Sequence, residues 1–192
     1  FTVLSFLLPC AVFSQERMPN EAGLIPVIAY HKVGDSDTEY TRSYSGFKED
    51  ISTFIREGFH PISLGEFHTG KISAPKGKIP VLLTFDDSSI SQFEYDKNGS
   101  IHPQSVVCIL EDFRKKNKGF DPKAVFFVLP GAKSPNNYFG QNEFQQKKTD
   151  FLLNNGYEIQ NHTLWHANLK QYSHLIEEQI VKTEIFVEKL AP

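Results

Sequence analysis

Two groups of residues in this sequence have the types and spacing for hydrolysis at a metal ion. The first is Thr84-Phe85-Asp86-Asp87, which places two adjacent carboxylates at the end of a strongly apolar run. Two such anions repel each other, and a shared proton or a bound cation would relieve the repulsion. The alternative is a strand-to-loop turn in which one aspartate caps the backbone.

The second group is the pair His162 and His166 in the segment NHTLWH. On a helical turn, two histidines four residues apart face the same way and can share one metal ion. An isolated HxxxH spacing is weak evidence, but this pair directly follows the candidate strand Gly156–Gln160. One aspartate and two histidines would form a nitrogen and oxygen ligand set with open positions for water, as in a catalytic zinc-type site.

Short β-rich runs that alternate with helical patterns must position these groups. Continuous apolar runs such as PVLLTF and KAVFFVL suit strands that are covered on both faces of a parallel sheet. This alternation predicts an α/β fold, in which the carboxyl ends of the strands meet at one rim. The expected strands are Leu24–Tyr30, Pro61–Leu64, Pro80–Phe85, Lys123–Leu129 and Gly156–Gln160. The expected helices contain Phe47–Ile55 (with Ser45 as its cap and Gly58 as its stop), Val106–Phe113, Phe151–Leu152 and Ile176–Leu190.

Two polar loops, residues 88–104 and 131–143, follow strands and therefore leave the same rim. Their aromatic residues could stack on sugar rings or pack the loops themselves, and we favour packing. These residues are Phe93, Tyr95, Tyr138 and Phe139.

Composition and charge narrow the classes of partner. The 192 residues carry a net charge of −3 with 40% apolar and 22% charged residues, which is typical of a globular chain. Without a basic run, the sequence predicts no nucleic-acid partner and no binding to an anionic membrane surface. The longest apolar stretch is too short to cross a bilayer, so no membrane span is predicted.

The first fourteen residues, FTVLSFLLPCAVFS, are uncharged and contain ten apolar side chains. They have the texture of a secretory h-region that begins inside its signal peptide, although a buried strand or helix is the alternative. We therefore expect a partial signal peptide at residues 1–14, a linker at 15–23 and one domain at 24–192. Export to the periplasm, cell envelope or extracellular space follows from this expectation.

TFDD followed by NHTLWH resembles the polysaccharide deacetylases of carbohydrate esterase family 4, the NodB-homology domain, whose signatures are TFDDG and H-[ST]-x-x-H. The run IPVIAYHKVGD resembles a subset with permuted motif order, in which a Tyr-His segment precedes TFDD. The resemblance covers about Leu24 to Leu190. It implies a distorted (β/α) barrel of the polysaccharide deacetylase type, which we expect to be truncated at its C-terminal end.

Carried over to this sequence, the resemblance implies a role for each candidate residue. Asp86 matches the general base, while Asp87, His162 and His166 match the ligands of one divalent metal ion, for which we expect zinc. His31 matches the general acid of the permuted subset. Without the resemblance, His31 would be interpreted as a surface histidine at the start of a polar loop.

The sequence also departs from the family pattern. Ser88 replaces the glycine after the aspartate pair, and Val125 and Gln160 stand where the family often has threonine and glycine. The later Arg-Pro motif, which orients the base and shapes the acetyl pocket, is expected just beyond Pro192.

The expected function is removal of N-acetyl groups from an N-acetylated polysaccharide or oligosaccharide by a metal-dependent hydrolase. One alternative is a non-catalytic carbohydrate-binding relative, which Ser88 and the absent Arg-Pro motif leave open. Another is a metal hydrolase of a different acyl amide or ester, which would use the same residues. The sequence leaves the oligomeric state open.

Overall fold

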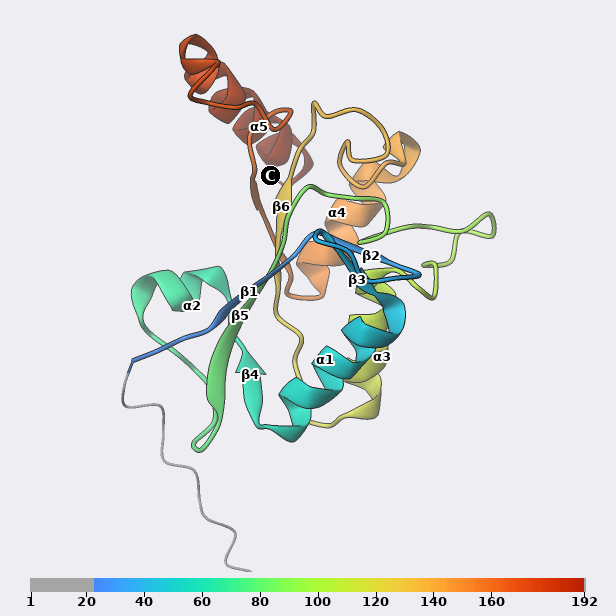
Figure 1. Cartoon of the computed structure of the whole chain (residues 1–192), viewed down its shortest axis with the longest axis vertical. Helices are drawn as coiled ribbons and strands as arrows, with labels where there is room; N and C mark the ends of the chain where they lie inside the picture. The colour runs from blue at the N-terminus through green and yellow to red at the C-terminus, as the bar shows by residue number, and fades with distance from the viewer. Residues whose placement is uncertain (1–22, 192) are drawn as a thin grey trace, which may run out of the picture.

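A parallel β-sheet forms the centre of the molecule (Figure 1). The computed structural model describes residues 23–191, so the signal peptide predicted at 1–14 and nearly all of the linker predicted at 15–23 lie outside the described residues. β5 pairs with β1 and β6 through its carboxyl half and with β4 through its amino half, and β7 pairs with β6. This arrangement confirms the α/β class, and the sheet is open across residues 23–191. The strands are β1 (Val27–Tyr30), β4 (Phe59–Pro61), β5 (Ile79–Phe85), β6 (Val125–Val128) and β7 (Glu158–Asn161).

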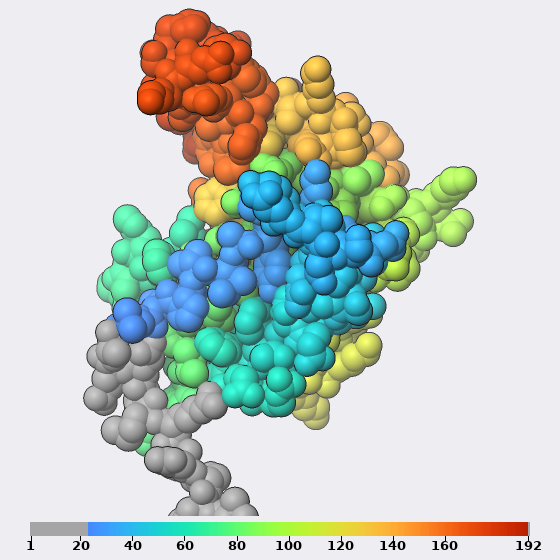
Figure 2. All heavy atoms as spheres, viewed as in Figure 1, coloured from blue at the N-terminus to red at the C-terminus, as the bar shows by residue number. Residues whose placement is uncertain are grey.

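Five α-helices connect or follow these strands in the described part of the chain, and α1 and α3 lie side by side over one face of the sheet (Figure 1). The last helix, α5, projects from one end of the molecule (Figure 2). No helix within residues 23–191 has the length and apolar character needed to cross a bilayer. The helices are α1 (Tyr44–Arg56), α2 (Leu64–Thr69), α3 (Val106–Lys116), α4 (Gln145–Asn154) and α5 (Ile176–Leu190).

Several element boundaries differ from the predicted ones for local reasons. α1 begins earlier because the hydroxyl of Ser43, and not that of Ser45, caps the helix by accepting the N–H of Gly46 in its first turn. The strand predicted at Pro61–Leu64 ends at Pro61, since Ser63 and Glu66 form a capping box that starts α2. Two short strands were not predicted: β2 (Lys32–Gly34) and β3 (Thr41–Ser43) pair in parallel.

A row of stacked aromatic rings crosses three neighbouring strands and fixes which way the strand ends point. The Phe85 ring stacks on Tyr30 of β1 at 5.5 Å and on Phe126 of β6 at 5.0 Å, and all three rings belong to the main core. Because side chains alternate along a strand, the residues after Tyr30 and Phe85 face the opposite side of the sheet. These residues are His31 and Asp86, and the register Tyr30↔Phe85 places them next to each other.

The aromatic residues of the two polar loops lie in the core. Phe93, Tyr138 and Phe139 are fully buried and Tyr95 is 4% exposed, so these rings are inaccessible to a sugar. They pack the two loops against each other, for example Phe93 against Phe139. This packing confirms the favoured interpretation of these residues.

The same loop packing buries the amino group of Lys148 on α4. Its Nζ donates to the carbonyl of Phe139 at 2.8 Å and lies over the rings of Phe93 and Phe139, while the side chain is fully buried. Burial disfavours the charged form and lowers the pKa of Lys148 to about 7, against the smaller opposing effects of Glu143 and Glu94.

We therefore expect the free energy of unfolding to fall as the pH is lowered from about 10 to 7. In this window the unfolded state binds a proton at Lys148 that the folded state does not, so the slope approaches about 1.4 kcal/mol per pH unit at most. The measurement is urea unfolding at several pH values. Lys148→Met should remove this component of the slope, whereas the same substitution at its exposed neighbour Lys147 should keep it. Parallel slopes for Lys148→Met and the unsubstituted protein would contradict the assignment.

Candidate metal centre

The aspartate pair sits where the chain leaves β5. The strand ends at Phe85, and the next residues turn sharply, with Asp87 at φ 72° and Ser88 at φ 42°. Left-handed backbone of this kind is uncommon in residues other than glycine and is concentrated at functional sites. The turn carries the Asp87 carboxylate to the carboxyl rim of the sheet rather than onward along the strand.

Ser88, which replaces the family's glycine, links this turn to the loop that follows β6. Its buried hydroxyl donates to the carbonyl of Asn136 at 2.9 Å and accepts the N–H of Leu129 at 3.0 Å. The carbonyl of Ser88 accepts the N–H of Phe139 at 2.8 Å. The substitution therefore braces the turn, and its hydroxyl is bound to backbone groups of another loop.

The two histidines lie in an irregular loop, so the prediction that they share a helical turn is wrong. β7 ends at Asn161, and the following segment contains Thr163 at φ 73° and His166 at φ 61°. A left-handed conformation is a genuine outlier for a β-branched threonine. The four-residue spacing brings the imidazoles together because the loop folds back on itself.

Polar side chains hold this histidine loop in place. The carboxamide oxygen of Asn161 accepts the N–H of Thr163 at 2.8 Å, and the Thr163 hydroxyl accepts the N–H of His166 at 3.1 Å. Gln179 of α5 accepts the N–H of Trp165 at 3.2 Å. The loop is thus fixed by its own polar residues and by one distant helix.

Gly131, in the loop after β6, touches the same histidine loop. Its N–H donates to the carbonyl of Leu164 at 2.6 Å. A Cβ at this position would lie 2.7 Å from the Leu164 side chain and 3.0 Å from its carbonyl oxygen. Only glycine permits this approach without displacing the loop that carries both histidines.

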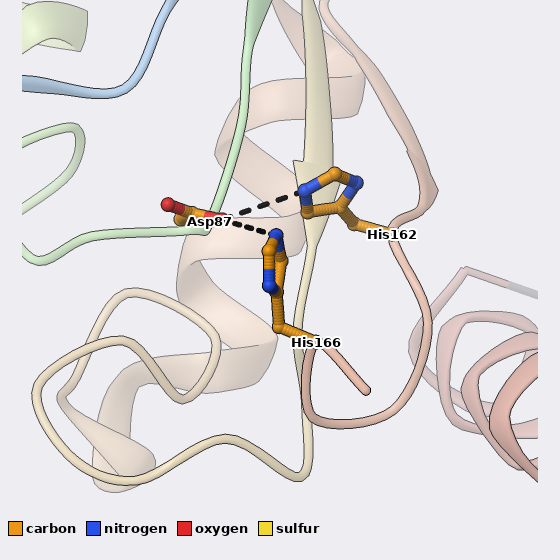
Figure 3. Close-up of side chains that lie close together, drawn as sticks. All are labelled: Asp87, His162 and His166. Carbon is orange, nitrogen blue, oxygen red and sulfur yellow. Dashed lines mark ion pairs between the residues drawn. The ribbon is translucent and has the colours of Figure 1, made fainter. Parts of the chain in front are cut away.

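These turns bring Asp87, His162 and His166 together, with both imidazoles directed at the carboxylate (Figure 3). The Nε2 atoms of His162 and His166 lie 3.4 and 3.6 Å from Asp87 Oδ1, and the two rings are 5.0 Å apart. One ligand atom from each residue falls within 4.8 Å of the others. The cluster is graded in exposure, from 22% for the Asp87 side chain to 64% for that of His166, so it opens toward solvent.

The chemistry of this donor set fits a divalent cation. Asp87 Oδ1 is buried and has no hydrogen-bond partner in the described part of the chain, a costly state for a carboxylate oxygen that a cation would relieve. Burial also lowers the pKa of His162 below its usual range, despite the opposing charges of Asp86 and Asp87. A lowered pKa favours the neutral imidazole, which is the form that binds metal ions.

Asp86 and His31 lie beside this cluster. The N–H of Asp86 donates to the carbonyl of Tyr30 at 2.9 Å, which places Asp86 next to the end of β1. The charges of both Asp86 and His31 act on the pKa of His162. His31 also lines a cavity of about 480 Å³ together with Tyr40, whose ring is 5.2 Å from the imidazole; the three clustered residues do not line it.

Sequence reasoning missed Trp165 as a surface residue at this site. Trp165 is 36% exposed and directly precedes His166 in the chain, and its ring packs edge-on against Tyr172 at 5.3 Å. An exposed indole can stack on a sugar ring. Its place inside the HTLWH segment was the available signal.

The carboxyl rim of a parallel sheet is where α/β folds place their active sites, and in this chain it carries a carboxylate and two imidazoles. A family model described as polysaccharide deacetylase matches residues 73–191, which is more than half of the chain. The chain belongs to the polysaccharide deacetylase family.

Several solved structures share the fold of this chain. A deacetylase from Streptococcus pyogenes, in complex with acetate, superposes with a TM-score of 0.64 at 22% identity, covering 86% of this chain and 68% of its own. A polysaccharide deacetylase from Bacillus cereus superposes with a TM-score of 0.63 at 19% identity, and the match covers 86% of this chain and 47% of that protein. A related protein from Bacillus anthracis superposes with a TM-score of 0.64 at 19% identity, and the match covers 86% of this chain and 47% of that protein. The chain thus spans about half of the length of the two Bacillus proteins, and a search of curated proteins found no match.

Proposed function

We propose that this protein is a metal-dependent hydrolase that removes N-acetyl groups from a polysaccharide or oligosaccharide. The observation that carries the proposal is Asp87 Oδ1, which has no hydrogen-bond partner among the described residues and faces two imidazoles beside a second aspartate in a polysaccharide deacetylase domain. Asp87, His162 and His166 would hold one divalent ion. Two imidazoles and one carboxylate suit zinc.

When bound, such an ion supplies a Lewis acid that polarises the acetamide carbonyl and favours deprotonation of water. The protein's own residues then move the protons. Asp86, the carboxylate beside the cluster, accepts a proton from the attacking water as general base. The water oxygen forms the new bond to the acetyl carbon.

His31 would complete the reaction as general acid. An amine leaves an amide only if its nitrogen is protonated, and an imidazole can supply that proton near neutral pH. The C–N bond then breaks, and acetate and the free amino sugar are the products. The register of β1 and β5 supports this role because it places His31 beside Asp86.

The substrate class rests on the family and on the surroundings of the site. The exposed Trp165 beside His166 provides a surface for a sugar ring. The S. pyogenes neighbour was solved with acetate, the product of deacetylation. Because residues 1–14 have the character of a signal peptide, we propose that the substrate lies in the periplasm, in the cell envelope or outside the cell.

The test is acetate release from oligomers of N-acetylglucosamine, measured with the metal-loaded full chain. N-propionyl and O-acetyl analogues serve as matched substrates. Acetate from the N-acetyl oligomer, lost with a chelator and restored by zinc, would support the proposal. Binding of the oligomer without turnover would favour a carbohydrate-binding relative, and preference for either analogue would favour a different acyl hydrolase.

A further inference from the structure

The side chain of Gln92 joins the ends of the two strands that carry His31 and Asp86. Its Nε2 donates to the carbonyl of His31 at 2.6 Å and to the carbonyl of Asp86 at 2.5 Å. Both partners are acceptors, so only the amide nitrogen can face them, and the chemistry fixes the orientation of the carboxamide. Gln92 is fully buried.

This bridge lies where the pairing of β1 and β5 ends. The last main-chain bond between the strands runs from the Asp86 N–H to the Tyr30 carbonyl, one residue before the His31 carbonyl. Beyond it the two chains separate, and the carboxamide of Gln92 fills the gap. It therefore sets the spacing between the backbones of His31 and Asp86 at the rim.

Gln92 itself is firmly held. Its N–H donates to the Ser89 carbonyl at 2.9 Å, and its carbonyl accepts the N–H of Val107 in the first turn of α3 at 3.0 Å. The neighbouring Ser91 accepts the N–H of Val33 in β2 through its hydroxyl at 3.2 Å. The bridge is thus anchored to a helix and to the segment that follows His31.

A second observation separates this bridge from ordinary packing. Gln92 Oε1 is buried without a hydrogen-bond partner in the described residues. The oxygen stays unpaired at a cost in stability while the nitrogen binds both carbonyls, so the position of the carboxamide is set by the two strand ends and not by full pairing of its own polar atoms.

We propose that Gln92 is a positioning residue that sets the distance between the general base and the general acid. The proposal rests on the proposed function and extends it to a residue outside both signature motifs. Displacement of a catalytic group by about 1 Å can cost about 10²-fold in rate. Loss of the bridge should therefore lower kcat and leave the metal cluster, which Gln92 does not contact, intact.

The experiment compares Gln92→Met and Gln92→Glu with Gln141→Met in the metal-loaded full chain. Met keeps the volume without a donor, and Glu turns an acceptor toward two carbonyls. Gln141 is a matched control because its side chain also binds backbone groups, the N–H and carbonyl of Tyr95.

We expect kcat for acetate release to fall about 10- to 100-fold in both Gln92 variants. KM and metal content should stay near their original values, and the pH dependence of kcat should change. Gln141→Met should lower the free energy of unfolding and leave kcat and its pH dependence unchanged.

The outcomes separate this proposal from the proposed function. Folded Gln92 variants with unchanged kcat and pH dependence would overturn the positioning role and leave the function standing. An unsubstituted protein that releases no acetate would overturn the function. If the variants fail to fold, or if the protein is inactive, NMR of the unsubstituted protein decides. Scalar couplings from Gln92 Nε2 to the carbonyl carbons of His31 and Asp86 support the bridge, and their absence overturns it.

Discussion

Asp87→Asn is expected to abolish both metal binding and acetate release, whereas Asp86→Asn should abolish only acetate release. Asp87 Oδ1 is the atom that both imidazoles face, and a neutral amide there would weaken the site for a divalent cation. Asp86 lies beside the cluster without belonging to it, and its proposed task is proton transfer. We expect metal content to fall from about one equivalent to near zero in the first variant and to remain near one in the second.

Turnover should fall at least about 10³-fold for Asp87→Asn and about 10²- to 10⁴-fold for Asp86→Asn. Metal analysis after gel filtration and acetate release from the same samples provide both numbers. Asp96→Asn, at a partly exposed position in the loop after β5, is the control and should change neither. If Asp86→Asn lost the metal and Asp87→Asn kept it, the two roles would be reversed.

His31→Ala is expected to lower turnover on an N-acetylated sugar about 10²- to 10⁴-fold with full metal content. The proton that His31 supplies is needed only when the amine leaves. An aryl acetate, whose leaving group departs without protonation, should therefore be hydrolysed by the variant almost as fast as by the unsubstituted protein. The fold-loss of turnover on the N-acetylated sugar, divided by the fold-loss on the aryl acetate, measures the contribution of His31 as general acid.

The pH dependence of kcat/KM gives a second check on His31. A general acid acts in its protonated form, so activity falls on the alkaline side as that proton is lost. This limb should disappear in His31→Ala and persist in a control, His68→Ala, on the exposed helix α2. An unaltered profile with near-original turnover in His31→Ala would remove His31 from the mechanism.

The sequence predicted those parts of the fold that local patterns determine. The continuous apolar runs located β5 and β6 to within two residues, because a strand covered on both faces has no polar positions to confuse the pattern. β1 is shorter than predicted and starts after Pro26, a residue that cannot donate to a strand partner. The pair β2 and β3 was missed because three-residue strands carry too little pattern.

The candidate site was predicted through the spacing of its motifs, and the error within it has a physical cause. A four-residue spacing is compatible with a helical turn, but it does not specify one. The histidine loop is held by its own Asn161 and Thr163 and also by Gly131 and Gln179, which lie outside the motif. Gln92 had no local signal at all, since its role depends on two carbonyls that only the folded sheet brings together.

The hydroxyl of Ser88 has a consequence for exchanging loops between members of this family. It ties the turn that carries Asp87 to backbone groups at Leu129 and Asn136, so the length and path of the loop after β6 are matched to a serine at position 88. A loop transplanted from a relative with glycine there comes from a protein in which no hydroxyl at this position binds the loop backbone. Conversely, Ser88→Gly would leave the buried N–H of Leu129 unpaired. Position 88 and the segment 129–139 therefore depend on each other structurally. Chimaeras designed to alter substrate preference should exchange both together.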